Sequence, residues 1–337
     1  MKRKFSFLYF AGAIIMLMVG CRPDSSGRQM PASMENVSIE RFDKDLFSGD
    51  PGNMDSIIAF LQHRYGSFFE LFTRRILAIG DTGTPGFKQH LQVFITNYDN
   101  YAAYRKVQQL YPGPGRLDKK LTDAFRQYQH YFPDKKVPRV VAFVSGFNYS
   151  VVSDSGLLGI GLDKYLGPEE EYYSRYGLYN YLRMNMHADK IPSDCMRLWA
   201  ETEFAYNDSV NNLLAHLIYE GKIMAFVKAM LPDDPDSLLW GFSGPQMEFC
   251  LKNEKHMWTY LVEYKQLFLT DRFTIDKYTL EGPFTSDFSK ESPGRAAVWI
   301  GYRIVEKYMK KNGSLSLEDL MKEDDYQKIL TLSGYNP

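Results

Sequence analysis

The chain of 337 residues carries 40 Lys and Arg against 41 Asp and Glu, which is a formal net charge of −1. Hydrophobic residues make up 45% and charged residues 24% of it, as in an ordinary globular protein. This composition excludes a disordered tail protein, a collagen-like fibre and a polytopic membrane protein. Because there is no basic excess to neutralise phosphates, we expect no nucleic-acid partner. Three cysteines are too few for a disulfide scaffold.

The N-terminus has the pattern of an export signal. Residues 2–4 are basic, and residues 5–19 form a run of 15 residues without a charge. A membrane-spanning helix needs about 20 apolar residues, so this run is typical of the hydrophobic region of a signal peptide. Gly20 and Cys21 follow it and resemble the lipobox of bacterial lipoproteins, in which the cysteine is lipidated and the bond before it is cut. We therefore expect a lipoprotein signal peptide over residues 1–20 and acylation, with palmitate among the chains, at Cys21. The alternatives are an uncleaved anchor and an ordinary signal peptide with an incidental cysteine.

Lipidation at Cys21 would attach the mature chain to a membrane, because several acyl chains together give stable anchoring. Residue 22 is Arg rather than the Asp that tends to retain lipoproteins at the inner membrane. This favours the outer membrane but does not decide the face. Of the two faces we expect the periplasmic side rather than the cell surface. Residues 21–36 are rich in Pro, Ser and Gly and read as a flexible tether. The mature chain from Cys21 has a net charge of −4.

The next elements are mostly helical. Residues 37–42 alternate in hydrophobicity and predict an edge strand. Helical spacing follows over residues 55–64, 68–78, 87–98, 99–111 and 118–132, with breaks at residues 112–115 and at Pro133. Three short β-rich runs, at 138–146, 149–154 and 157–163, are separated by Gly and Asp turns. They predict a small antiparallel meander.

Helices dominate the rest of the chain as well. They are predicted over 169–186, which is rich in tyrosine, and over 194–204, 209–231 and 243–270. Ser292 and Pro293 are typical of the start of a last long helix. The fold class is therefore α+β, mainly helical, with one domain over 37–337 and its small sheet around 138–165. Cys195 and Cys250 lie in apolar helical settings and could form a disulfide or remain buried thiols.

The helix over 209–231 is apolar on most sides, which indicates a buried helix. Glu220 lies on one of its apolar stripes, where a carboxylate is costly unless it is paired. His216 precedes it by one turn and shares its face. Glu220 is then either a structural acid satisfied by an Arg or Tyr of a neighbouring helix, with Arg295 as one candidate, or part of a metal or substrate site. Gly221 indicates that another backbone passes close by.

The segment at 213–222, LLAHLIYEGK, resembles the gliding-motility lipoprotein family GldB. The resemblance covers essentially the whole mature chain and includes further segments at 159–167, 181–185, 196–199, 230–233, 253–258 and 287–309. It implies a lipid-anchored, non-catalytic structural or assembly component of the gliding machinery, or of the secretion machinery coupled to it. Such a component would have protein partners in the envelope.

That family is in turn similar to zinc-peptidase-like domains of the gluzincin type, which have an H-E-x-x-H helix and a later glutamate ligand. The resemblance would place the H-E-x-x-H helix at 194–204, Glu220 at the third ligand, and the strands near Gly146 and Gly161 at the substrate edge. However, residues 194–204 contain no histidine, and no two of the six histidines lie three or four residues apart. Zinc catalysis needs three protein ligands.

We therefore expect a pseudoenzyme with no metal, no cofactor and no catalytic residue. In this interpretation His216 and Glu220 are remnants of a former site, and Glu201, Glu203 and Arg295 are cleft residues. Two alternatives remain. One is a hydrolase, with or without a metal, that uses an unrecognised site near Glu220. The other is a lipoprotein that binds peptide or glycan in the same cleft.

Overall fold

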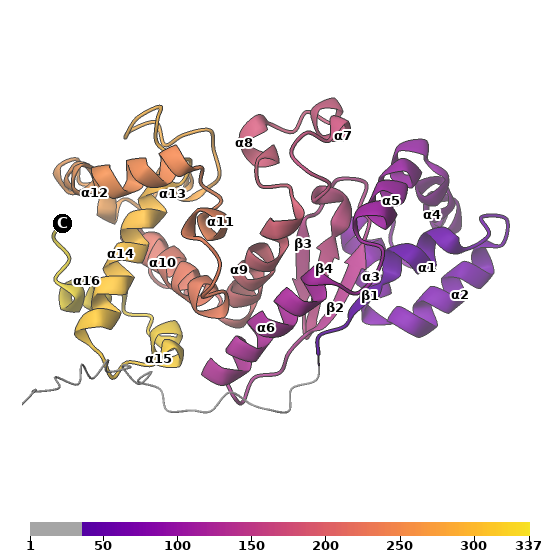
Figure 1. Ribbon diagram of the computed structural model, residues 1–337, viewed down its shortest axis with the longest axis horizontal. Coiled ribbons are helices and arrows are strands. Elements are labelled where there is room, and N and C mark those ends of the chain that lie inside the picture. Colours follow the sequence, from indigo (N-terminus) through magenta and orange to yellow (C-terminus); the bar gives the residue numbers. More distant parts are fainter. Residues whose placement is uncertain (1–35) are drawn as a thin grey trace, which may run out of the picture.

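A four-stranded mixed sheet stands between two groups of helices in the computed structural model, which describes residues 36–337 (Figure 1). The predicted signal peptide, Cys21 and all but the last residue of the predicted tether lie outside the described residues. Helices α1–α5 lie on one side of the sheet, α6 and α9 lie on the other, and α12–α16 form the far end of the molecule. Within residues 36–337, no helix is both long and apolar enough to cross a membrane.

The sheet contains β1 (Ile39–Arg41), β2 (Arg139–Phe143), β3 (Val151–Asp154) and β4 (Leu157–Gly161), in the order β1-β2-β4-β3. The predicted antiparallel meander is wrong, because only β3 and β4 pair antiparallel, whereas β2 is parallel to both β4 and β1. The hairpin folds so that β4 rather than β3 lies against β2. Every residue of β4 is buried, which fits a strand covered by helices on both faces. The expected edge strand is confirmed as β1.

Apart from α1, which was not predicted, the N-terminal helices follow the predicted pattern closely. They are α1 (Phe42–Ser48), α2 (Met54–Tyr65), α3 (Ser67–Leu71) with a π-helical turn at Phe72–Ile76, α4 (Phe87–Thr96), α5 (Tyr98–Leu110) and α6 (Arg116–Tyr131). Aromatic rings attach them to the sheet. The ring centroids of Phe42 and Phe68 lie 5.1 Å apart, and those of Phe68 and Phe143 of β2 lie 5.8 Å apart.

The C-terminal part is entirely helical apart from its connections. Its helices are α7 (Glu171–Arg175), α8 (Asn180–Arg183), α9 (Ile191–Glu203), α10 (Leu213–Met230), α11 (Asp236–Trp240), α12 (Gly244–Glu263), α13 (Arg272–Thr279), α14 (Ala296–Lys311), α15 (Leu317–Lys322) and α16 (Tyr326–Ser333). Short 3₁₀ turns occur at Leu162–Lys164, Ala188–Lys190 and Gln266–Phe268.

The helix expected over 243–270 ends early, at Glu263. Three further expected boundaries in this part are wrong for local reasons. The single helix over 169–186 is split into α7 and α8, because the chain turns at Gly177 with φ of +73°. Helix α10 begins at Leu213 rather than 209, capped by the Asn212 side chain, which accepts a 2.9 Å hydrogen bond from the Ala215 amide. Helix α14 begins three residues after Pro293. Ser292 is instead used in the preceding loop, where its hydroxyl oxygen accepts a 3.0 Å bond from the Thr285 amide.

Helix α10 is the buried centre of the C-terminal part, as its apolar sequence predicts. Helices α6, α9, α13, α14 and α16 contact it. Its closest neighbour is α14, because Gly221 of α10 and Gly301 of α14 let the two backbones meet. The expectation drawn from Gly221 is thus confirmed. This packing sets α9 and α10 side by side, which positions the charged groups described next.

Candidate ligand pocket

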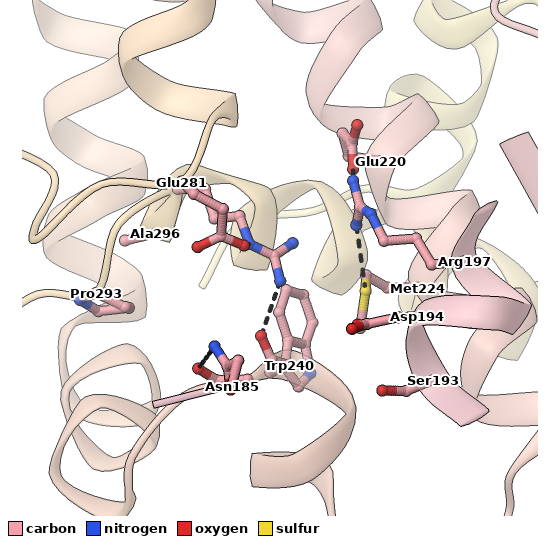
Figure 2. A network of polar contacts seen from close by, with 12 residues as sticks. Asn185, Ser193, Asp194, Arg197, Glu220, Met224, Trp240, Glu281, Pro293 and Ala296 are labelled. Carbon is pink, nitrogen blue, oxygen red and sulfur yellow. Dashed lines mark hydrogen bonds and ion pairs between the residues drawn. The ribbon is translucent and has the colours of Figure 1, made fainter. Parts of the chain in front are cut away.

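The interior of the α9–α10 interface holds an arginine between two carboxylates. Arg197 of α9 places its Nη2 atom 2.6 Å from Glu220 Oε2 of α10, and its Nε atom 3.1 Å from Glu201 Oε1 one turn along α9. Figure 2 shows Arg197 reaching from α9 toward Glu220 and passing Met224. Of the two hypotheses for Glu220, the arrangement is that of the structural acid with an arginine partner. Arg197, and not Arg295, supplies that partner.

The spacing of these three residues is the one that the resemblance to zinc peptidases implies for the metal ligands. Their side-chain types differ from those ligands. Arg197 and Glu201 are four residues apart on one helix, and Glu220 comes from the next helix. The guanidinium is itself the cation that two carboxylates hold, and no imidazole is present among the three. Within residues 36–337 no group of three His, Cys, Asp or Glu side chains could bind a metal ion. These residues do not fit zinc, and the similarity to a zinc-peptidase scaffold stays an expectation.

Burial and the short distances between the charges shift the pKa values of Arg197 and Glu201. Desolvation opposes the charge of Arg197, but the carboxylates of Glu220 and Glu201 outweigh it, so that its pKa lies above the ordinary arginine value. Desolvation raises the pKa of Glu201, and the neighbouring Glu220 raises it further, against the opposing effect of Arg197. Arg197 therefore stays charged, and it offsets part of the cost of burying the Glu201 carboxylate.

The other predicted cleft residues do not converge on Glu220. Glu203 points to the opposite side of α9, where Lys135 lies 2.8 Å away and the Tyr128 hydroxyl donates a 3.0 Å bond. His216 stacks on Tyr206 with ring centroids 4.3 Å apart, and burial lowers the pKa of His216. Neither Glu203 nor His216 lines the pocket next to Arg197.

Arg295 does lie in that pocket, but with a different partner from the one suggested by the sequence. Its Nε atom lies 2.8 Å from Glu281 Oε1, and its Nη2 atom donates a 2.8 Å bond to the Trp240 carbonyl. The Glu281 side chain and the Trp240 carbonyl are both visible in Figure 2. The suggested Arg295–Glu220 pair is therefore wrong. Arg295 precedes α14 in the left-handed region, with φ of +49°, a conformation that a non-glycine residue adopts at a cost in energy.

The pocket encloses a volume of about 240 Å³ and is bordered by α9, α10, α11 and the loop before α14. Six charged side chains line it: Lys164, Lys190, Arg197 and Arg295, with Asp194 and Glu281. The rest of the lining is largely apolar or amide in character and includes Leu182, Asn185, Met186, Met224, Val227, Leu239 and Trp240.

The two lysines of the pocket differ in their surroundings. Lys190 is 6% exposed and lies 3.1 Å from Asp194 Oδ1, and its ammonium also donates to Ser193 Oγ at 2.9 Å. Lys164 is half-buried and forms no ion pair within the described part of the chain. Desolvation lowers the pKa of both lysines. Lys164 thus faces the pocket with no carboxylate within ion-pair distance among residues 36–337, while the adjacent Asp163 opposes the effect of desolvation on its pKa.

Sequence reasoning identified Glu220, Glu201 and Arg295 and missed Arg197, Lys164, Lys190 and Glu281. Arg197 had one usable indication, since it stands four residues before Glu201 on the same helix. The others come from separate loops and helix ends that only the fold brings together.

The sequence left open whether Cys195 and Cys250 form a disulfide. Cys195 and Cys250 are both free and buried, and burial raises the pKa of both thiols, that of Cys250 to about 12.

Fold and site together describe a mainly helical α+β protein whose interior carries an arginine-centred ion cluster beside a charged pocket. The family model described as gliding motility protein GldB matches residues 25–337. The chain therefore belongs to the GldB family, and the resemblance in its sequence is confirmed. Neither the curated proteins nor the solved structures gave a significant match.

Proposed function

We propose that this chain is a lipid-anchored protein of the cell envelope that serves the gliding machinery, or the secretion machinery coupled to it, as a structural or assembly component. Membership of the GldB family over residues 25–337 carries the proposal. The lipobox at Cys21 supports attachment to the outer membrane, with the folded part on the periplasmic side. Its partners are other envelope proteins, and it uses no nucleic acid.

The proposed role is non-catalytic. Support comes from the ion cluster, because the guanidinium of Arg197 already engages the two carboxylates that a metal would need. A permanently charged arginine cannot act as a general base and does not leave its carboxylates free to activate water. Metal analysis of the intact protein in detergent tests this point. About one tightly bound zinc ion per chain would favour the hydrolase alternative instead.

The cellular role is tested by deleting the gene and measuring gliding, protein secretion and envelope integrity. We expect gliding or secretion to be lost and to return when the wild-type gene is supplied. A complementing gene that encodes Arg197→Lys is the second arm, because it keeps the buried cation while changing its geometry. It should restore function if the cluster is structural. A deletion strain that behaves as wild type in all three assays would contradict the proposal.

A further inference from the structure

We propose that the pocket bordered by α9, α10, α11 and the loop before α14 binds the free carboxylate end of a peptide whose last residue is apolar. This inference goes beyond the assembly role and does not depend on it. It rests on unused hydrogen-bond donors, one unpaired cation, and the apolar remainder of the pocket wall.

The strongest observation is a buried donor without a partner. Arg295 is 5% exposed, and neither Nη1 nor Nε has a hydrogen-bond partner, although Nε lies 2.8 Å from Glu281 Oε1 as an ion pair. Only Nη2 donates a hydrogen bond, to the Trp240 carbonyl. A buried N–H group without an acceptor destabilises the folded protein. Arg295 lines the pocket, so an acceptor placed there would approach its guanidinium. The left-handed backbone of Arg295 is a second cost at the same position, as is common at binding sites.

One cation of the pocket wall has no carboxylate within ion-pair distance among the described residues, although the neighbouring Asp163 acts on it from further away. Among the cations of the wall, Lys190 is paired with Asp194, Arg295 with Glu281, and Arg197 with two carboxylates behind the pocket. Lys164 alone has no ion pair among residues 36–337. A single carboxylate would supply that partner and would also accept from Arg295 Nη1. Its two oxygens suit two donors that approach from different parts of the wall.

The apolar part of the pocket wall indicates which chemical group is attached to that carboxylate. Leu182, Met224, Val227, Leu239 and Trp240 offer apolar surface that a small inorganic anion would leave uncovered. The volume of about 240 Å³ lies below the roughly 300 Å³ at which ordinary ligand pockets begin. It therefore suits the last residue of a chain better than a large molecule. A chain terminus also lets the remainder of the peptide leave through the open side.

Binding is measured by fluorescence polarisation with the intact protein in detergent and a fluorescein-labelled peptide that ends in Ala-Ala-Leu. The peptide with a free carboxylate should bind at least tenfold more tightly than the same peptide with a C-terminal amide. Unlabelled free-acid peptide should compete, and inorganic phosphate and acetate should compete only at much higher concentration. Equal affinity for acid and amide, competition by phosphate as strong as by peptide, or no saturable binding would each overturn the inference.

Substitutions of pocket residues test whether the peptide binds in this pocket. Lys164→Gln should weaken binding of the free acid about tenfold and leave binding of the amide unchanged, without changing thermal unfolding, because this half-buried lysine holds no ion pair. Lys88→Gln is the matched control, since Lys88 pairs with Asp55 on the exposed surface of α4. Arg295→Lys, which removes Nη1, should weaken acid binding further if it folds. Unchanged acid binding in Lys164→Gln would count against the proposed site.

Discussion

For Glu220, the sequence predicts the need for a counter-charge but not which residue supplies it. Its position on an apolar stripe of α10 required a partner, and the structure supplies Arg197 at 2.6 Å. The need for a counter-charge follows from the desolvation of a carboxylate and is local to the helix. The identity of the counter-charge depends on which helix packs opposite.

Replacing Arg197 by Met should destabilise the protein strongly, because Glu201 and Glu220 would lose their shared cation. Breaking a buried pair from one side costs about 3–5 kcal/mol. The side chains of Glu220 and Glu201 keep 16% and 33% exposure, so we expect about 2–4 kcal/mol in urea unfolding. Arg272→Met is the control, because this exposed pair with Asp276 should contribute less than about 1 kcal/mol. Adding Glu220→Gln to the Arg197→Met chain should recover part of the loss. A double variant no more stable than the single one would contradict the pairing.

Asp163 predicts a pH dependence of stability. Its buried carboxylate accepts bonds from the Phe147 amide at 2.6 Å and the Ser145 amide at 3.0 Å, at the ends of the adjacent parallel strands. Burial nevertheless raises the pKa of Asp163 from 3.8 to about 6. Between these two values the folded protein keeps a proton that the unfolded chain has lost, so this contribution to stability is full below about pH 4 and disappears as the pH rises through 6.

The variant Asp163→Asn removes this titration. The free energy of unfolding of the wild type, measured relative to that of the variant, should fall by about 2–3 kcal/mol from pH 4 to above pH 6. Urea unfolding at a series of pH values gives both curves. Parallel curves over this range would show that Asp163 ionises normally in the folded protein.

At the scale of elements, α10 and α14 form the most extensive helix contact within residues 36–337, at paired glycines. A glycine at position 221 lowers the helix propensity of α10. Its presence there is explained by the backbone of Gly301 in α14, which leaves no room for a side chain. A Cβ atom added at Gly301 would lie 1.8 Å from the Leu217 carbonyl oxygen, which is backbone and cannot move aside.

Gly301→Ala should therefore push the two helices apart. Overpacking of this kind costs about 1–3 kcal/mol or more, which exceeds the gain of up to about 1 kcal/mol in helix propensity. Gly244→Ala in α12 is the matched control, because nothing lies within 4 Å of the added Cβ there. Thermal denaturation should show a lower midpoint for Gly301→Ala and an unchanged or higher one for Gly244→Ala. The reverse order would exclude the close helix crossing.

Attachment is a property of the whole molecule. Within residues 36–337 no helix could span a membrane, and the proposed anchor at Cys21 lies outside that range. Because Cys21 is the proposed site of lipidation, Cys21→Ser should move the protein from the membrane fraction to the soluble fraction on centrifugation. Cys250→Ala, which removes a buried free thiol instead, should leave it in the membrane fraction. Retention of the Cys21→Ser variant would refute lipidation as the anchor.

Features with local causes were predictable from the sequence. Helix α2 starts where Asn53 caps it, with its side chain accepting from the Ser56 amide, and α6 ends just before Pro133. The burial of α10 followed from its apolar circumference, and the close backbone at Gly221 from a glycine within a helix. Membership of the GldB family was carried by segments spread along the chain, and the lipobox at Cys21 is a sequence pattern that needs no fold to be read.

Only the tertiary structure decided which elements meet. The alternation of β2, β3 and β4 predicts strands but not that β4 inserts beside β2, because hydrophobic pattern specifies a face and not a neighbour. Likewise the sequence required a partner for Glu220 and one for Arg295. Their assignment to Arg197 and Glu281 depends on the crossing of α9, α10 and α14. The charged pocket has the same origin, since Lys164, Lys190 and Arg295 come from distant segments and share one wall only after these helices have packed.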